Sequence, residues 1–147
     1  MTSEKEALLE SEVRRAMDRR AESVRSRDVD AAVSVVAPDI VSYDVVGVLQ
    51  NIGLDEYRKR ATEWFSSFEG EIAYEVRDLS ISAGDDFAFC HSLNHINGKR
   101  KGGQPIDMWW RATVCFHRIG GRWLIVHEHS SVPFDGSSGN ARLDLKP

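Results

Sequence analysis

From Glu71 onward, apolar and polar residues alternate with a period of two, which is the pattern of β-strands. Turn residues divide this stretch at 84–86, 97–103 and 119–121. Aromatic and β-branched residues, which favour strands, are frequent on both sides of the last of these turns. The sequence therefore predicts four consecutive antiparallel strands between residues 71 and 132, the last two forming a β-hairpin.

The first half of the chain shows the three- and four-residue spacing of amphipathic helices. It predicts a helix over residues 4–26, in which Arg20 falls within the apolar stripe. A short second helix, capped by Asp28 or Asp30, should run through Val36 and be stopped by Ala37-Pro38. A short strand at 40–44 and a third helix over 54–68 should follow. We therefore expect an α+β fold in which three N-terminal helices pack on a strongly curved antiparallel sheet, forming a cone with an interior pocket.

Length, composition and net charge indicate the class of protein and its expected partners. The 147 residues, of which 41% are hydrophobic and 29% charged, are typical of one globular domain. We expect this domain to span residues 1–134, followed by a flexible tail over residues 135–147 that contains several Gly and Ser. The net charge of −4 argues against a nucleic-acid partner.

No apolar run approaches the roughly 18 residues of a membrane-spanning helix, so we expect no membrane partner. The N-terminus lacks the pattern of a signal peptide, and the cytoplasm is the expected compartment. The two cysteines, Cys90 and Cys115, should be reduced thiols within strands.

The predicted hairpin leaves open which strand face lines the pocket. Strict alternation puts one set of residues on one face of the last strand: Trp123, Ile125, His127, His129 and Ser131. The preceding strand has a mixed face, with Trp109, Arg111, Thr113, Cys115 and His117, and an almost wholly apolar face, with Met108, Trp110, Ala112, Val114 and Phe116. A mixed face suits a mostly apolar pocket with a few polar groups. We expect it inside, with a homodimer built on the apolar face; the alternative is a half-buried sheet with a solvated polar edge.

The order of these elements resembles that of the nuclear-transport-factor-2-like (NTF2-like) superfamily, and especially its SnoaL-like and ketosteroid-isomerase-like members. The segments that carry the resemblance are Tyr43–Gly47, Trp64–Phe65, Trp109–Thr113 and Gly121–Ser131. The resemblance spans about residues 8–134 and implies the cone fold. It does not imply one reaction, because the superfamily includes isomerases, cyclases, dehydratases, oligomerisation modules and transport adaptors.

Within this resemblance, Asp44 matches the general base of ketosteroid isomerases. That catalytic Asp stands just before Pro-Val-Gly, and Asp44 stands just before Val45-Val46-Gly47. The resemblance implies that Asp44 removes a proton next to a carbonyl from a position on an apolar wall. The alternative is that Asp44 caps a turn. The first helix has no Tyr and the next-to-last strand has no interior carboxylate, so the oxyanion hole of the steroid enzymes is missing.

Arg111, His91, His127 or His129 would then have to stabilise an enolate. The expected catalytic residues are Asp44, His127 and Arg111. The expected ligand pocket is lined by Tyr43, Trp64, Phe68, His91, Trp109, Thr113 and His129. We expect an isomerase- or lyase-like enzyme without a cofactor that acts on a small hydrophobic or carbonyl-containing molecule. The alternative is a non-catalytic ligand-binding or oligomerisation module of the same fold.

His127-Glu128-His129 also permits a metal hypothesis, because two histidines at i and i+2 lie on the same side of a strand. Gly121, which five residues separate from His127, matches the start of a cupin metal motif. The next cupin ligand would fall at Pro133 or Phe134, neither of which binds metals. We therefore expect two pocket histidines and no bound metal.

Overall fold

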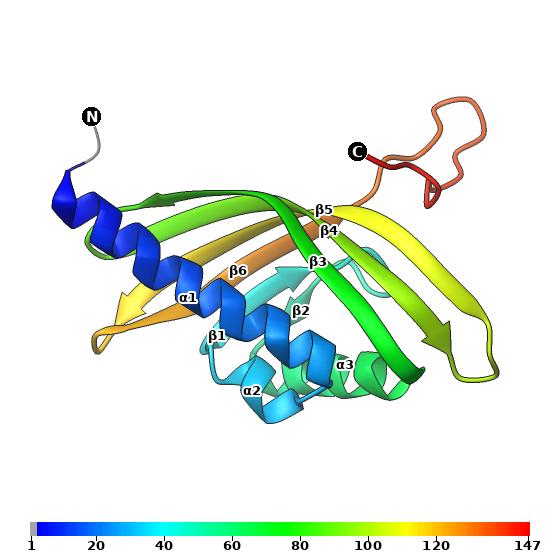
Figure 1. Ribbon diagram of the computed structural model, residues 1–147, viewed down its shortest axis with the longest axis horizontal. Helices are drawn as coiled ribbons and strands as arrows, with labels where there is room; N and C mark the ends of the chain where they lie inside the picture. The colour runs from blue at the N-terminus through cyan, green and yellow to red at the C-terminus, as the bar shows by residue number, and fades with distance from the viewer. Residues whose placement is uncertain (1–2) are drawn as a thin grey trace.

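Helices lie on one side of a long twisted sheet in the computed structural model, which describes residues 3–147 (Figure 1). The helices are α1 (Glu4–Ser26), α2 (Val29–Val33) and α3 (Leu54–Ser66). The strands are β1 (Val36–Tyr43), β2 (Asn51–Ile52), β3 (Phe68–Ala83), β4 (Phe87–Arg100), β5 (Pro105–Ile119) and β6 (Arg122–Ser131). The α+β class and the four long consecutive strands that the sequence predicts are confirmed.

The two N-terminal helices begin and end where local chemistry favours it. The Ser3 side chain accepts a hydrogen bond from the backbone N–H of Glu6 at 3.1 Å and caps α1. α1 ends at Arg27, whose φ of 55° is left-handed. Asp28 then caps α2 by accepting from the N–H of Ala31 at 3.0 Å.

The strand order in the sheet is β2-β1-β6-β5-β4-β3. The pairs from β3 to β6 are antiparallel, but β1 and β6 are parallel. The expectation of a wholly antiparallel sheet is therefore wrong. After β1, the chain passes through β2 and α3 and then follows the β3–β6 meander, which brings β6 beside β1 in the same direction. The sheet is mixed and stays open, with β2 and β3 at its edges.

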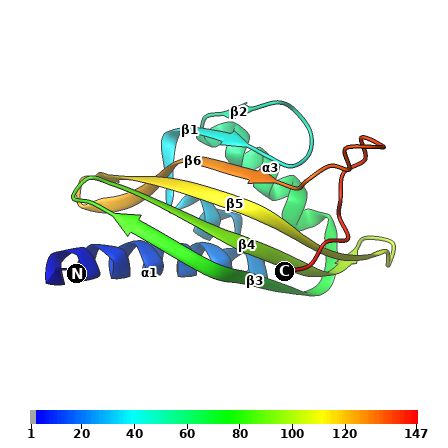
Figure 2. The same ribbon diagram turned by 90° about the horizontal axis from the view of Figure 1, so that it is seen from above.

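All three helices cover the concave face, with α1 below the β3 edge and α3 below the β1 and β6 side, and the convex face is uncovered by helices (Figures 1 and 2). Two hydrophobic clusters fill the space between helices and sheet. One lies against the N-terminal half of α1 and includes Leu9, Val13, Phe116, Trp123 and Ile125. The other lies against the C-terminal end of α1 and α3 and includes Val24, Phe65, Phe68, Ile72 and Ile96.

The assignment of the β5 faces from the sequence is wrong. Ala112, Val114 and Phe116 are buried under the helices, whereas Arg111 and Thr113 are exposed on the convex face. All three helices lie on one side of this sheet, and the hydrophobic effect places the more apolar strand face against them. Met108, Trp110, Val114 and Phe116 therefore do not form an outer dimer face.

The prediction that side chains along β6 alternate strictly between the two faces is also wrong, because the strand contains a β-bulge. Cys115 pairs with His127, but the next residue, Phe116, pairs with Ile125, so that Val126 is an extra residue. Trp123 and Ile125 face the helices before the bulge. After it the phase is reversed: Glu128 lies opposite Val114 on the concave side, and His127 and His129 lie on the convex side.

After β6 the chain forms a hook on the convex side of the sheet (Figure 1). Phe134 and Ala141 form a β-bridge, and the Arg142 N–H donates to the Pro133 carbonyl at 2.8 Å. The division into a domain and a flexible tail stays a prediction. None of the helices in the described part of the chain has the length and hydrophobicity that a membrane crossing requires.

Candidate functional site

A group of polar side chains lies between the two hydrophobic clusters on the concave side of the sheet. We call it the interior polar cluster, and its members are Arg20, Tyr57, Tyr74, Ser92, Asn94 and Glu128. Each comes from a segment whose neighbouring inward residues belong to the hydrophobic clusters. On α1, for example, Arg20 lies between Met17 of one cluster and Val24 of the other. The cluster is therefore surrounded by apolar groups from several elements.

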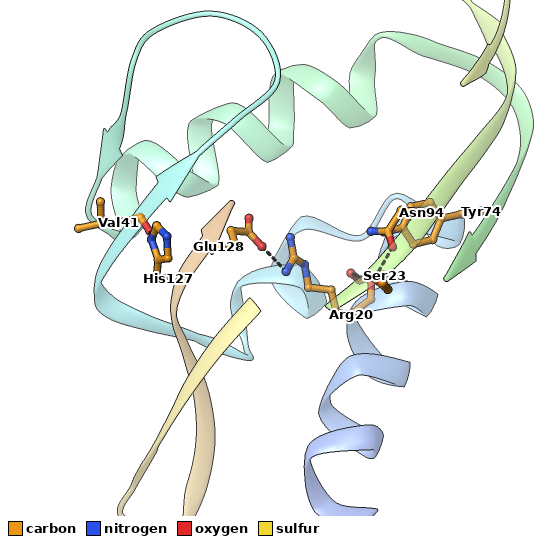
Figure 3. Close-up of polar contacts among 8 residues, drawn as sticks. Arg20, Ser23, Val41, Tyr74, Asn94, His127 and Glu128 are labelled. Atoms are coloured by element: carbon orange, nitrogen blue, oxygen red, sulfur yellow. Dashed lines mark hydrogen bonds and ion pairs between the residues drawn. The ribbon is translucent and has the colours of Figure 1, made fainter. Parts of the chain in front are cut away.

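Arg20 and Glu128 form an ion pair at the centre of this cluster and point toward each other from α1 and β6 (Figure 3). Their side chains retain 21% and 15% of their exposure, so water still reaches the pair. Burial alone would lower the pKa of Arg20, but the charge of Glu128 and its hydrogen bond raise it above its usual value. Arg20 is therefore held in its charged form.

Two tyrosine hydroxyls lie near this ion pair. Burial raises the pKa of Tyr57 above its usual value; the Arg20 charge opposes this effect, and the Glu128 charge adds to it. Burial likewise raises the pKa of Tyr74 to about 12. Both hydroxyls consequently stay protonated at neutral pH and can donate hydrogen bonds.

A hydrogen-bond chain fixes the Tyr74 side of the cluster. The Asn94 amide Nδ2 donates to Tyr74 Oη at 2.9 Å, and the Ser92 hydroxyl donates to Asn94 Oδ1 at 2.7 Å. The adjoining wall is aromatic, since the Trp110 ring packs against Tyr74 at 6.0 Å and against Trp64 at 6.5 Å between centroids. Aromatic walls with a few convergent polar groups are typical of small-molecule sites.

Sequence reasoning missed Glu128 because strict alternation placed it on the face opposite its actual one. A signal for Arg20 did exist: an arginine at the spacing of an apolar stripe needs a buried partner. Tyr57 and Tyr74 follow helix and strand periodicity and are indistinguishable in sequence from core residues. The hydrogen-bonded pair Ser92 and Asn94 carries no motif.

The structure places Asp44 outside the cone. β1 ends at Tyr43, and the exposed Asp44 carboxylate accepts a hydrogen bond from the Val45 N–H at 2.7 Å. This is the geometry of a turn cap, and it lacks the apolar wall that a buried general base requires. Asp44 is therefore not brought together with Trp64, Trp109 or Arg111.

The other predicted site residues are divided between the two faces of the sheet. Trp64 and Phe68 lie inside, where their rings are 5.7 Å apart. The remaining ones lie on the convex face: Tyr43, His91, Trp109, Arg111, Thr113, His127 and His129. There the Tyr43 ring packs edge-on against His127 and His129 at 4.8 and 5.3 Å. The predicted pocket is thus not one site.

His127 Nδ1 lies 2.6 Å from the Val41 carbonyl oxygen, which orients its ring (Figure 3). Within residues 3–147, no three potential metal-ligating side chains come together. A hollow of about 430 Å³ opens near the end of α3, and its lining includes Arg27, Phe65, Phe68 and Lys101. No member of the interior polar cluster lines this hollow, so the two are separate features.

No curated protein matches the chain. Among solved structures, an NTF2-like protein of unknown function from Pseudomonas putida KT2440 is 33% identical, with a TM-score of 0.88 over 96% of this chain and 98% of that one.

Two more distant structures share the fold alone. A ketosteroid isomerase-like protein from Erwinia carotovora atroseptica SCRI1043 is 18% identical, with a TM-score of 0.71 over 83% of this chain and 94% of that one. The association domain of C. elegans CaMKII is 13% identical, with a TM-score of 0.72 over 88% and 100% of the two chains. The fold therefore occurs in proteins of different classes.

The family model described as the SnoaL-like domain matches residues 13–135, which is most of the chain. Its extent agrees with the resemblance that the sequence suggested and with the helices and strands described above. The chain belongs to the SnoaL-like domain family of the NTF2-like superfamily.

Proposed function

We propose that this protein binds a small carbonyl-containing molecule within the cone and catalyses proton transfer next to the carbonyl, with Glu128 as the base. The observation that carries this proposal is the Arg20–Glu128 pair, set between aromatic walls and beside two tyrosine donors. A carboxylate can accept a proton, and the ion pair with Arg20 fixes the position of the Glu128 carboxylate. Glu128 thus takes the role that the sequence suggested for Asp44.

The proposed reaction has two proton transfers. Glu128 takes the proton from the carbon next to the carbonyl, and the electrons of the broken C–H bond move to the carbonyl oxygen to form an enolate. The protonated Tyr57 or Tyr74 hydroxyl donates a hydrogen bond to this oxygen and stabilises its charge. The Glu128 carboxyl, which water can reach, exchanges this proton with solvent and then protonates a carbon of the enolate, which leaves Glu128 ionised again.

The test is to measure, by NMR in D₂O, the rate at which the protein exchanges the α-protons of 2-tetralone, an enolisable aromatic ketone. Glu128→Gln should slow the exchange by at least about 100-fold, because the amide cannot accept the proton. Asp44→Asn is the matched control and should exchange at the wild-type rate. A loss of exchange in Asp44→Asn alone would return the role of base to Asp44.

Glu128→Gln leaves Arg20 without its partner and could unfold the protein, so a second variant is needed. Tyr57→Phe keeps the ion pair and should slow exchange by about tenfold or more if its hydroxyl stabilises the enolate. Circular dichroism checks that each variant is folded. A folded wild type that binds 2-tetralone without exchanging its protons would favour the alternative, a ligand-binding module without catalysis.

We also propose a homodimer through the convex face of the sheet. Two phenylalanine side chains there, Phe87 and Phe89, are 63% and 50% exposed. Large apolar groups gathered on an uncovered sheet face are typical of a protein interface. Sedimentation equilibrium at micromolar concentration tests the dimer, and a mass near 16.6 kDa would contradict it.

The free thiols Cys90 and Cys115 agree with the cytoplasm as the proposed compartment.

A further inference from the structure

All five histidines of the chain lie on the convex face of the sheet. They are His91 and His95 on β4, His117 on β5, and His127 and His129 on β6. The register shows how close two of them are, because His91 and His129 pair with the same residue, Thr113, from opposite sides. The concave face has none, so one side of the sheet carries every imidazole in the protein.

Aromatic rings accompany these imidazoles. His95 stacks on Trp109 and His117 stacks on Phe87, both with ring centroids 4.4 Å apart. Along the convex side of β4 and β5, Arg111 is the one fully charged residue between Asp107 and the β5–β6 turn. A centre rich in aromatic side chains and arginine and poor in other charges is characteristic of protein–protein interfaces.

The size of this face fits a second copy of the chain. The four strands β3–β6 include 15-residue β5. At about 4.8 Å between strands and about 45 Å of length, they present an area of roughly 800–900 Å². Each partner of a standard interface contributes roughly 800 Å². Two such faces can pack against each other with two-fold symmetry, so each histidine would occur twice in the interface.

We infer that the convex face joins two copies of this chain only while the histidines that lack a carboxylate partner are neutral, so that mild acidification separates the dimer. The inference rests on the proposed homodimer and adds its regulation. Imidazole takes up its proton between about pH 8 and 5. Protonation in a closed interface would bury uncompensated positive charges, whereas in the separated monomers water solvates them.

The ionisable neighbours of these histidines do not compensate most of the charge. They are Tyr43 on β1, Glu75 and Arg77 on β3, and Asp107, Arg111 and Cys115 on β5. Among the described residues, His95 alone has a carboxylate partner, Asp107, at 2.6 Å. His91 and His129 instead share the neutral Thr113, and Arg111 on the same strand adds a further positive charge. A proton on either of these two histidines would therefore be the least compensated charge in a closed interface.

The experiment is sedimentation equilibrium of the full chain from pH 8.0 to pH 5.0 at constant ionic strength. Each histidine that must lose its proton on assembly contributes two protons per dimer, one from each copy. Linkage then makes the dimer Kd rise by up to roughly 100-fold per pH unit for each such histidine once imidazole is titrating. Circular dichroism at pH 5.0 checks that the monomer stays folded.

Two variants assign the effect. The double substitution His91→Gln and His129→Gln should preserve the dimer at pH 8.0 and reduce the dependence of Kd on pH. If the double variant does not dimerise, the single variants serve instead, and each should lower the slope of log Kd against pH. His95→Gln is the matched control and should leave the slope unchanged, because Asp107 already accommodates the charge of His95.

A dimer that is equally tight at pH 8.0 and 5.0 overturns the inference but leaves the proposed homodimer intact. An unchanged slope in the variants that lack His91 or His129 overturns it as well. A monomer at every pH overturns both the inference and the homodimer, without bearing on proton transfer at Glu128.

Discussion

The two faces of the sheet place aromatic rings beside ionisable groups in different surroundings. On the concave face, Trp110 lies next to the cluster that contains Arg20 and Glu128, and helices cover both. On the convex face, the preceding residue Trp109 stacks on His95, which contacts Asp107, and no helix covers them. An aromatic ring beside an ionisable group therefore does not by itself reveal which side of a strand is buried. The position of the helices decides that, and it separates a candidate ligand site from a candidate interface.

The largest expected difference between the faces concerns core packing. Phe116→Ala should lower the free energy of unfolding by about 3–5 kcal/mol, because it leaves a cavity where the side chain is fully buried. Phe89→Ala on the convex face should lower monomer stability by less than about 1 kcal/mol. Urea unfolding at two protein concentrations separates monomer stability from any loss of dimer. Equal losses for both variants at low concentration would contradict the assignment of faces.

The second comparison concerns arginines on the two faces. Arg20→Met should destabilise the fold by about 3 kcal/mol, because it leaves the Glu128 charge partly buried without its partner. Arg111→Met is the control and should change monomer stability by less than about 0.5 kcal/mol, since Arg111 is exposed. Adding Glu128→Leu to Arg20→Met should recover part of the loss. No recovery would show that Arg20 acts through packing and not through its charge.

The third prediction uses the buried hydroxyl of Tyr74. Because burial raises its pKa to about 12, the folded state holds this proton more tightly than the unfolded state does. The resulting stability is fully present below about pH 10, the pKa of an unfolded tyrosine, and is lost as pH rises through about 12. Its loss is at most about 1.4 kcal/mol per pH unit. The free energy of unfolding, measured in urea between pH 9 and pH 12, should fall less steeply with pH for Tyr74→Phe than for wild type.

The smallest expected effect is that of Asp44→Asn. The asparagine side-chain oxygen can accept the same hydrogen bond from the Val45 N–H, so stability should change by less than about 0.5 kcal/mol. A melting-temperature measurement tests this. A drop as large as that of Arg20→Met would mean that Asp44 has a buried role that its exposed position does not explain.

Much of the fold was predictable because helix and strand periodicity are local properties. The apolar stripe of α1 predicts its extent, and the turns at 84–86 and 119–121 predict the ends of the strands. The parallel pairing of β1 and β6 was not predictable in this way, because the two strands are far apart in sequence.

The candidate site was predicted only in part. Trp64 and Phe68 do lie inside the cone, because the aromatic stripe of α3 and the start of β3 have no other apolar surface to cover. Glu128 was missed because Val126 is an ordinary strand residue, and nothing in its neighbourhood distinguishes a bulge from regular alternation.

The sequence by itself determined the three helices and the long strands, because side-chain spacing along the backbone is enough to give each of them an apolar side. It did not determine the short β2 or the start of β1 at Val36, which the sequence placed in the second helix. Only the tertiary structure decided which side of β5 faces the helices and that Glu128 meets Arg20. Those outcomes depend on packing between segments far apart in the chain and on one extra residue in β6. Burial is a property of the assembled layers, whereas periodicity is a property of each segment alone.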